Sequence, residues 1–419
     1  MRVFKFGGAS VKDAAGVINI LSVLKHTGFS ETLIVVSAMG KTTNALEEVV
    51  KNYFDENSRY LEDLEKIKQN HYQIIAELFQ QDSAQTKENI NQLFEEIIVF
   101  LNHNNSKDYS LIYDQVVSLG ELVSTTIISN YITSQGIKNR WLDARKCIKT
   151  DSYYRDANLD WEATQKSILK AADGNSTLIS QGFIGSDSEG LTTTLGREGS
   201  DYSAAIFAYA LDAESVTIWK DVPGVLNADP RVFKDTQLLR QISYREAIEL
   251  AYYGASVIHP KTLQPLQRKE IPLFVKSFEN PADDGTSVSK GITLEPLVPC
   301  FILKKNQTLL KLSSLDFSFI VEENISEIFA LLHKFQMRVE MIQNSAISFS
   351  ICIYNKYDKL EGLLEALASK FKVKVVDGVS LYTIRHFDKP AINFIKNRDA
   401  KVLLEQRTLK TAQFVIKEN

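Results

Sequence analysis

Cysteine and positive charge are both scarce in this chain. Only three of its 419 residues are cysteines, Cys147, Cys300 and Cys352, and they lie far apart with no C-x-x-C pair, which argues against a disulfide framework and a zinc site. The 48 Lys and Arg residues are outnumbered by 52 Asp and Glu residues, for a net charge of -4, so neither nucleic acid nor a membrane surface is expected as a partner. We expect a protein of the reducing cytoplasm.

Long apolar runs and two common nucleotide-binding motifs are also missing. No eighteen-residue window is wholly apolar, and the N-terminal MRVFKFGG is interrupted at once by lysine and glycine, so neither a membrane span nor a signal peptide is predicted. The chain contains no G-x-x-x-x-G-K-[ST] and no G-x-G-x-x-G after a strand, which argues against a P-loop and a dinucleotide fold. Its length is typical of two domains.

What the N-terminal part does contain is an alternation of strand and helix patterns. Short apolar runs of the kind buried in a parallel sheet occur at residues 3–6, 32–37, 177–179, 215–219 and 273–275. Apolar residues recur at helical spacing between residues 46 and 102. The alternation predicts an α/β fold, with a mostly parallel central sheet between helix layers.

Prolines, a glycine and small residues between positions 280 and 299 separate this part from a second one. We therefore expect two domains, of residues 1–295 and 300–419. In the second, a β, α, β, β pattern over residues 308–353 is followed by a helix at 360–371 and recurs over residues 379–416. We predict a smaller α+β domain with two copies of one module, the second truncated.

Lys5 ends the first strand just before two glycines, in the sequence KFGGAS that closes with Ser10. Because Gly7 and Gly8 have no Cβ, the backbone N–H groups there can approach a phosphate closely, beside the point charge of the lysine. The alternative is an ordinary strand-to-helix turn with a solvated lysine. Further on, Glu121 in SLGE is expected in the first turn of a helix, where simple capping is the alternative to a binding role.

The loop of residues 192–203, TTTLGREGSDYS, is the richest in chemistry. Arg197 offers a planar fork for a carboxylate or phosphate, and Asp201 could hold a substrate ammonium group or a metal-bound water. Gly196 and Gly199 bracket this pair, and GFIG precedes it at residues 182–185. This pattern favours a backbone that closes on a ligand over an ordinary surface loop.

Charged residues also follow the strand at residues 215–219. Lys220, Asp221 and Arg231 lie beyond its carboxyl end, where open α/β sheets bind ligands, and are candidates for nucleotide contacts; the alternative is a solvated turn. His259 has no triad-like partner nearby in the sequence, so we interpret it as a histidine that satisfies a helix end.

Together these segments resemble the aspartate kinases of the amino acid kinase superfamily. The match runs in order over residues 3–278 and comprises KFGGAS with Ala9 in place of Thr, VVSAMGKTTN, SLGE, GFIG, TTLGREGSDYSAA, and WKDVPGV followed by DPR. The resemblance implies the amino acid kinase fold. For residues 300–419 it implies ferredoxin-like ACT modules, which in the family bind effector amino acids and mediate dimerisation.

The resemblance also implies an activity, namely transfer of the γ-phosphoryl group of ATP, with Mg²⁺, to the β-carboxylate of L-aspartate. This is the first step toward lysine, threonine and methionine. The acceptor is already an anion and needs no general base. By carry-over, the catalytic residues are Lys5 and Asp201, which would orient Lys5 or the substrate. The L-aspartate site is Ser37, Thr43, Phe183, Ser200, Arg197 for the α-carboxylate and Glu121 for the ammonium group. The nucleotide site is Lys5, Gly7, Gly8, Ser10, Lys220, Asp221, Arg231 and Lys261, and no residue is assigned to a metal.

Departures from the family pattern concern both domains. Glu198 places an extra carboxylate beside Arg197, and Ser256 replaces a family lysine for which Lys261 is a nearby substitute. In the first ACT-like module, residues 321–324 stand where family members commonly have a glycine. We expect a homodimer formed through the C-terminal domain, with inhibition by lysine reduced or lost.

Two other functions stay open at this point. One is a related kinase that acts on another acidic or carbamoyl substrate. The other is a regulatory protein that keeps the fold and binds an amino acid or ATP without turnover.

Overall fold

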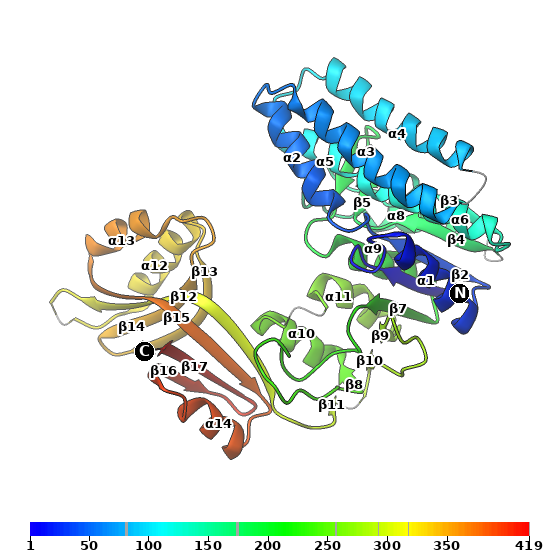
Figure 1. Cartoon of the computed structure of the whole chain (residues 1–419). Helices are drawn as coiled ribbons and strands as arrows, with labels where there is room; N and C mark the ends of the chain where they lie inside the picture. Colours follow the sequence, from blue (N-terminus) through cyan, green and yellow to red (C-terminus); the bar gives the residue numbers. More distant parts are fainter. Residues whose placement is uncertain (80–82, 173–175, 256–257, 292, 317, 419) are drawn as a thin grey trace. The chain divides into compact units, whose positions relative to one another are not determined.

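The computed structural model describes residues 1–79, 83–172, 176–255, 258–291, 293–316 and 318–418 (Figure 1). Ser256 therefore lies outside the described residues. The chain forms two compact units. The larger consists of Met1–Val225, Leu238–Ile248 and Val257–Glu295, and the smaller of Leu226–Gln237, Glu249–Ser256 and Pro296–Asn419.

The larger unit is built on one mixed sheet. Within the described residues this sheet has nine strands, in the order β11-β8-β10-β9-β7-β1-β2-β4-β3. Its middle strands are parallel from β9 to β3, and β10 runs antiparallel to β9. The bounds are β1 (Arg2–Phe6), β2 (Thr32–Val36), β3 (Asn139–Leu142), β4 (Thr177–Gln181), β7 (Ser215–Lys220), β8 (Gln241–Ser243), β9 (Leu273–Ser277), β10 (Thr286–Ser289) and β11 (Leu294–Glu295), with a separate hairpin of β5 (Ile184–Ser186) and β6 (Thr192–Thr194).

Helices cover this sheet, and the sequence marks where they begin and end. For example, α1 starts after Asp13, whose carboxylate accepts the Gly16 N–H at 2.8 Å, and stops at Gly28, whose φ is +79°. The bounds are α1 (Ala14–Thr27), α2 (Thr42–Phe54), α3 (Arg59–Leu78), α4 (Ala84–His103), α5 (Tyr109–Val117), α6 (Leu119–Ser134), α7 (Ala144–Cys147), α8 (Trp161–Ala171), α9 (Gly199–Ala210), α10 (Tyr244–Tyr253) and α11 (Pro260–Arg268).

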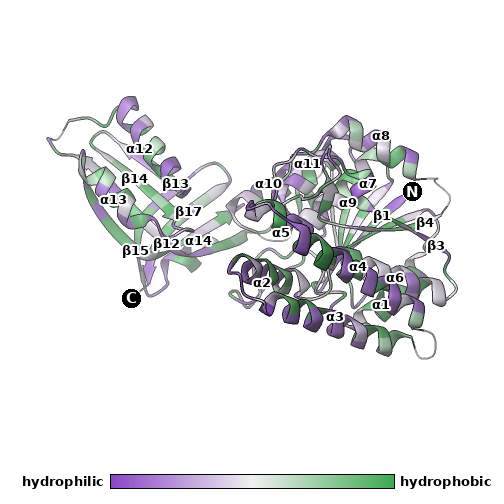
Figure 2. Ribbon diagram, turned by 90° about the horizontal axis from the view of Figure 1, so that it is seen from above, coloured by the Kyte–Doolittle hydropathy of each residue, from purple (hydrophilic) through white to green (hydrophobic). Residues whose placement is uncertain are grey.

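The two faces of the sheet are buried by different helices. Successive side chains of a strand point to opposite faces, so Phe4 and Phe6 of β1 lie on one face and Lys5 on the other. Phe4 and Phe6 belong to one core cluster with apolar residues of α1 to α6, whereas α9 contacts β1 on the Lys5 face. Along α3 and α4, hydrophilic residues alternate with hydrophobic ones (Figure 2). The predicted α/β fold with helix layers around a mostly parallel sheet is confirmed.

One helical stretch, Tyr109–Ser134, has the length and apolar composition of a membrane span. It comprises α5 and α6, and 89% of its most apolar part is buried inside the protein. These properties are those of a core helix of the α/β unit, and the stretch packs against the central sheet through α6.

The smaller unit contains a second sheet and three helices within the described residues. The strand order is β13-β14-β12-β15-β17-β16. The bounds are β12 (Cys300–Ser314), α12 (Glu322–Lys334), β13 (Arg338–Ser345), β14 (Ser348–Tyr354), α13 (Leu360–Ala368), β15 (Phe371–Arg385), α14 (Lys389–Lys396), β16 (Ala400–Arg407) and β17 (Thr411–Glu418). This arrangement confirms the predicted α+β class.

The long strands β12 and β15 each serve both sequence repeats. In the first repeat, residues 308–313 of β12 pair with β14, while in the second, residues 380–385 of β15 pair with β17. Residues 300–304 of β12 pair with residues 381–385 of β15. Register shifts between Lys304 and Leu309 separate this pairing from that of the rest of β12. The second repeat therefore has a fourth strand from residues 300–304, which the sequence pattern did not predict.

Candidate active site

Four neighbouring strands bring many of the predicted residues to one edge of the larger sheet. β7, β1, β2 and β4 are adjacent and parallel, so their carboxyl ends meet at the same edge. This is the edge at which open α/β sheets bind ligands. The residues at or directly after these ends are Lys220 of β7, Gly7 after β1, Ser37 after β2 and Gly182 after β4.

A charge cluster of Lys5, Asp201 and Lys220 lies at this edge. Lys5 Nζ is 2.6 Å from Asp201 Oδ1, and Lys220 Nζ is 3.4 Å from Asp201 Oδ2. Asp201 is fully buried and Lys5 is only 7% exposed. Burial alone would raise the pKa of Asp201, but the two ammonium groups outweigh it and hold the pKa below its usual value. Asp201 is therefore ionised and bridges the two lysines.

Local backbone geometry brings Asp201 to this position. It lies in the first turn of α9, which starts after Glu198 in the left-handed conformation with φ of +56°. A Cβ on Gly199 would lie 2.5 Å from Cδ2 of Phe183, so only glycine allows the helix to begin this close to Phe183. The helix thereby presents the Asp201 carboxylate to the lysines of β1 and β7.

The glycine turn after β1 packs closely against the loop after β2. A Cβ on Gly8 would lie 2.6 Å from the carbonyl oxygen of Ala38, and the Gly40 N–H donates to the Gly8 carbonyl at 3.0 Å. On the other side, Lys5 Nζ lies 3.3 Å from the position of a Cβ on Gly7. Ser10 is buried, and its N–H donates to the Gly7 carbonyl at 3.0 Å. The turn thus places half-buried glycine backbone beside an ammonium group.

Glu121 lies in the first turn of α6, but α6 does not start freely. The Leu122 N–H donates to the Ser118 carbonyl, and the Ser118 N–H donates to the Asp114 carbonyl, so α5 and α6 are nearly continuous. The simple capping interpretation therefore loses its basis, because there is no free helix N-terminus for Glu121 to stabilise.

The surroundings of the Glu121 carboxyl group are sparse. Oε1 accepts a long hydrogen bond of 3.4 Å from the Ala38 N–H, and Oε2 has no hydrogen-bond partner among the described residues. Burial raises the pKa of Glu121 to about 8. Within the described residues, therefore, Glu121 has no ion pair, and its Oε2 receives no hydrogen bond.

The other predicted aspartate-site residues surround the same edge. Phe183 has φ of +70°, and its N–H donates to Ser203 Oγ at 2.9 Å. Ser200 lies against Gly182, where a Cβ would be 2.5 Å from Ser200 Cβ. Ser37 is half-buried and its carbonyl accepts from Ser124 Oγ at 2.8 Å, and half-buried Thr43 lies in the first turn of α2.

Arg197 is exposed, directly after Gly196 with φ of +74°. The neighbouring Glu198 is exposed as well, and the two form no ion pair within the part of the chain that the structure describes. The loop thus leaves the Arg197 guanidinium accessible to a ligand.

Three predicted nucleotide-site residues are not brought into the charge cluster. Asp221 is exposed. Arg231 belongs to the smaller unit and is paired with Asp229 on the surface at 2.8 Å. Lys261 pairs with Asp156 at 2.5 Å, and Asp156 Oδ1 lies 2.4 Å from the position of a Cβ on Gly196. Lys261 is therefore beside the Arg197 loop.

The interpretation of His259 is confirmed. It is the N-cap of α11, and its Nδ1 accepts the Lys261 N–H at 3.2 Å. A histidine that satisfies a helix end in this way needs no catalytic role.

Sequence analysis missed Asp114, whose carboxyl group ties the end of β6 and the loop at Arg155 to α5. Asp114 is fully buried in α5 and accepts hydrogen bonds from Thr194 and from the Arg155 N–H. The signal was available, because Asp114 is a lone carboxylate within an otherwise apolar helical stretch. A buried carboxylate in such a position needs specific partners.

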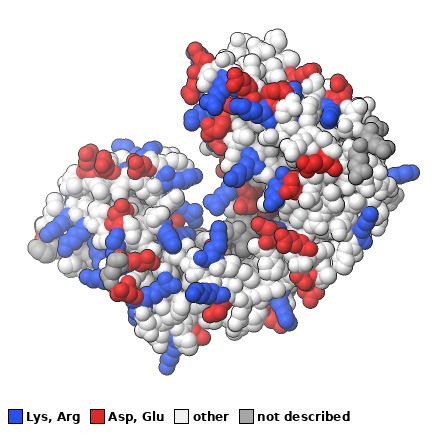
Figure 3. Space-filling view, in the orientation of Figure 1, with Lys and Arg blue, Asp and Glu red and all other residues white. Residues whose placement is uncertain are grey.

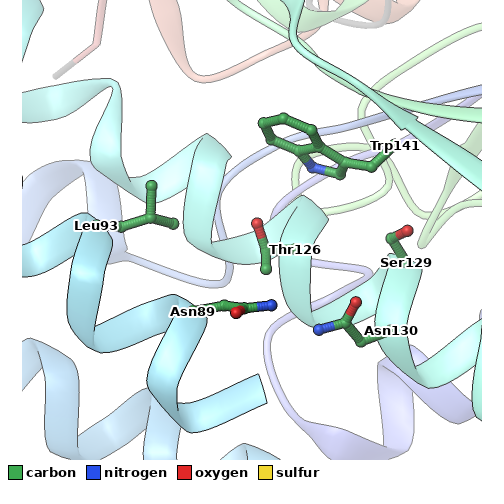
Figure 4. Close-up of a pocket in the computed structure, with 6 residues that line it drawn as sticks. All are labelled: Asn89, Leu93, Thr126, Ser129, Asn130 and Trp141. Atoms are coloured by element: carbon green, nitrogen blue, oxygen red, sulfur yellow. The ribbon is translucent and has the colours of Figure 1, made fainter. Parts of the chain in front are cut away.

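Cavities described elsewhere in the larger unit are distinct from this cluster. One, of about 270 Å³, lies between α4, α6 and Trp141 of β3 and is lined by uncharged side chains only: Asn89, Leu93, Thr126, Ser129, Asn130 and Trp141 (Figure 4). Another, of about 410 Å³, lies between the loop of residues 39–42 and α3. Neither is lined by Lys5, Glu121 or Asp201. On the visible surface, acidic and basic side chains are interspersed (Figure 3), as expected from the small net charge.

Comparison with known proteins identifies the family. Residues 1–277 match the model of the amino acid kinase family. The chain is 33% identical over 392 residues to lysine-sensitive aspartokinase 3 of Escherichia coli, which covers 91% of this chain and 86% of that protein. It is also 29% identical to the bifunctional aspartokinase/homoserine dehydrogenase 1 of Arabidopsis thaliana, of whose length it spans 42%.

Solved structures agree with this assignment. The crystal structure of E. coli aspartokinase III in complex with lysine and aspartate has a TM-score of 0.82 and 30% identity, and the match covers 99% of this chain and 95% of that one. The complex of the same enzyme with aspartate and ADP has a TM-score of 0.81 and 29% identity, over 99% and 96% of the two chains. The chain belongs to the amino acid kinase family and, within it, to the aspartokinases.

Proposed function

We propose that this protein transfers the γ-phosphoryl group of ATP to the β-carboxylate of L-aspartate, giving 4-phospho-L-aspartate and ADP in amino acid biosynthesis. The observation that carries the proposal is the cluster of Lys5, Asp201 and Lys220 beside the Gly7–Gly8 turn. Two lysine ammonium groups next to glycine backbone suit a transferring phosphoryl group.

In this proposal Lys5 offsets charge on the transferring group. Both reactants are anions, so the reaction depends on holding them in line while cations reduce their repulsion. Asp201 holds Lys5 Nζ at 2.6 Å and keeps the ammonium group aimed at the glycine turn. Lys220 contributes a second cation from the neighbouring strand β7.

L-Aspartate is bound through its two α-substituents. The exposed Arg197 binds the α-carboxylate with its planar fork. The buried Glu121 carboxyl group, which lacks a cation in the free protein, receives the ammonium group. The remaining wall is formed by Ser37, Thr43, Phe183 and Ser200. The β-carboxylate is then left free to attack without any proton transfer.

ATP binds through Lys5, Gly7, Gly8, Ser10 and Lys220 at the strand ends. Asp221 and Lys261, which lie outside the charge cluster in the same unit, are further nucleotide contacts in this proposal. Asp201 is already occupied by two lysines, and no group of three or more His, Cys, Asp or Glu in the described residues could hold a metal ion. Mg²⁺ therefore fits here only as an ion carried mainly by phosphate oxygens and water, where it neutralises phosphate charge.

The direct test is trapping of the acyl phosphate as its hydroxamate, with Mg-ATP and with or without L-aspartate. We expect aspartate-dependent hydroxamate from the wild type and at least about a hundredfold less from Lys5→Ala, because a cation at the transferring group is lost. Lys12→Ala, which removes an exposed lysine seven residues further on, is the matched control and should keep activity. A folded wild type that binds ATP without making hydroxamate would overturn the proposal.

The assignment of residues 1–295 to a catalytic domain and 300–419 to a tandem ACT-like domain remains a proposal, as do the homodimer and an amino acid effector. The shared strands β12 and β15 support one continuous regulatory domain. Sedimentation of the full chain should give a dimer. Inhibition of hydroxamate formation by lysine should be weak or absent, and strong inhibition at low lysine concentration would contradict that expectation.

A further inference from the structure

We infer that Asp114 is a positioning residue, which sets the distance between the two groups that bind the α-carboxylate and the ammonium group of the amino acid substrate. The inference rests on the roles proposed above for Arg197 and Glu121. Asp114 touches neither group directly and acts on them through the backbone of β6 and of helices α5 and α6.

The Asp114 carboxylate ties two separate segments to helix α5. It accepts the Thr194 N–H and Thr194 Oγ1, each at 2.8 Å, and the Arg155 N–H at 3.0 and 3.2 Å. Gln115, the next residue, adds a reciprocal pair of bonds with the backbone of Thr192 at 2.8 and 3.1 Å. Strand β6 and the loop around Arg155 are thereby fixed to the same helix.

These two segments contact the backbone that leads into Arg197. Thr194 ends β6 three residues before Arg197. The Ala157 N–H donates to the Thr194 carbonyl at 2.9 Å, and Asp156 packs against Gly196. The backbone just before Arg197 therefore continues from β6 and packs against the loop of residues 155–157, and both segments are hydrogen-bonded to Asp114.

The same helical stretch connects Asp114 to Glu121. Helical hydrogen bonds run through the junction of α5 and α6, from the Ser118 N–H to the Asp114 carbonyl and from the Leu122 N–H to the Ser118 carbonyl. Asp114 and Glu121 are seven residues apart, which in an α-helix is about 10 Å along the axis and nearly the same face. One helix therefore fixes the spacing between the Arg197 loop and the Glu121 carboxyl group.

This spacing matters only for a ligand that uses both groups at once. L-Aspartate carries an α-carboxylate and an ammonium group, and its binding energy depends on reaching both without strain. Succinate keeps both carboxylates of L-aspartate but lacks the ammonium group. 3-Aminopropanoate keeps the ammonium group and the β-carboxylate but lacks the α-carboxylate. A protein with altered spacing can still bind succinate through Arg197 and 3-aminopropanoate through Glu121, because each compound uses only one of the two groups.

The test is Asp114→Asn. The amide NH₂ group is a donor and cannot accept hydrogen bonds from Thr194 or the Arg155 N–H, so some of these bonds are lost. We expect the KM for L-aspartate to rise at least about tenfold, with the KM for ATP changed less than about threefold. The inhibition constants of succinate and 3-aminopropanoate, measured as competitors of L-aspartate, should also change less than about threefold. Equal losses for all three amino-acid-site ligands would overturn the inference, because they would indicate general damage to the site.

Asp187→Asn is the matched control. Like Asp114, Asp187 is a buried carboxylate; it lies on the β5–β6 hairpin and accepts from Ser152, Tyr154 and the N–H groups of Glu189 and Leu191, not from Thr194 or Arg155. It should lower the thermal stability to a similar extent without raising the KM for L-aspartate. An equal rise of KM in both variants would contradict the inference. Absence of activity in the wild type would instead refute the proposed function, independently of Asp114.

A milder pair keeps the test valid if Asp114→Asn does not fold. Thr194→Val removes one hydroxyl bond to Asp114, whereas Thr193→Val removes a hydroxyl bond of 2.7 Å to Thr150 from the neighbouring position of the same strand. We expect a selective rise of about threefold in the KM for L-aspartate with Thr194→Val only. The same KM for both valine variants and the wild type would overturn the inference.

Discussion

The candidate active site contains two buried carboxyl groups, one on its phosphate side and one on its amino acid side, and their pKa values are shifted in opposite directions. On the phosphate side, Asp201 is fully buried between Lys5 and Lys220, and these cations keep its pKa below the usual value. On the amino acid side, Glu121 is equally buried but has no ion pair in the described part of the chain, and burial raises its pKa to about 8.

The difference indicates which side is complete before substrate arrives. The phosphate side has its charges paired in the free protein, so its cations are already oriented for the transferring group. The amino acid side has a carboxyl group that becomes a favourable anion only when a cation is supplied. We interpret this as a site in which the ammonium group of L-aspartate provides the charge that Glu121 lacks.

Removing the carboxylate from the phosphate side should have the largest effect. Asp201→Asn removes the anion that pairs with the buried Lys5, and breaking a buried pair in this way costs about 3–5 kcal/mol of unfolding free energy. We also expect kcat to fall at least about a hundredfold. Urea unfolding and hydroxamate formation measure both quantities. Asp212→Asn breaks the surface pair with Lys269 and should cost less than about 1 kcal/mol; equal losses would contradict the distinction.

Replacing the carboxyl group on the amino acid side should impair binding yet improve stability. Glu121→Gln should raise the KM for L-aspartate about 10- to 100-fold through loss of a charged hydrogen bond. Because the pKa of Glu121 is raised in the folded state, the wild type loses stability as pH rises from about 4.5 to about 8, on the order of 4 kcal/mol. This loss should be absent in the variant. Parallel stability curves for the two proteins across this pH range would show that Glu121 is not neutral in the folded state.

A smaller effect is expected where the glycine turn meets the loop after β2. A Cβ introduced by Gly8→Ala would lie 2.6 Å from the Ala38 carbonyl oxygen, so backbone must shift, at a cost of about 1–3 kcal/mol. Gly7→Ala would meet only the flexible end of Lys5 at 3.3 Å and should cost less. Thermal unfolding and the KM for ATP distinguish the two, and a larger cost for Gly7→Ala would contradict the packing described here.

Much of the larger unit was predictable because strong local patterns coincide with strand ends. The apolar runs at residues 3–6, 32–37 and 215–219 became β1, β2 and β7, and the motifs after them lie at one edge of the sheet. Parallel strands that are buried on both faces leave few alternatives for such runs. Residues close to a strand end, such as Lys5, could therefore be assigned to a site from the sequence.

Longer-range features could not be predicted in the same way. The hydrogen bonds between Asp114 and Thr194 join residues 80 positions apart. No local sequence pattern predicts which backbone N–H groups a buried carboxylate will bind. The strand at residues 300–304 was missed because its partner in β15 lies far along the chain. Helix capping stayed open as an alternative for Glu121 because the sequence did not reveal that α5 continues almost directly into α6.

Calorimetric titration of L-aspartate at pH 7, in two buffers with different ionisation enthalpies, tests the contrast between the two carboxyl groups most directly. With a pKa of about 8, Glu121 is mostly protonated in the free protein and should ionise when the ammonium group binds. We predict release of nearly one proton on binding to the wild type and none on binding to Glu121→Gln. Binding to the wild type without proton release, or equal release from the two proteins, would contradict the account.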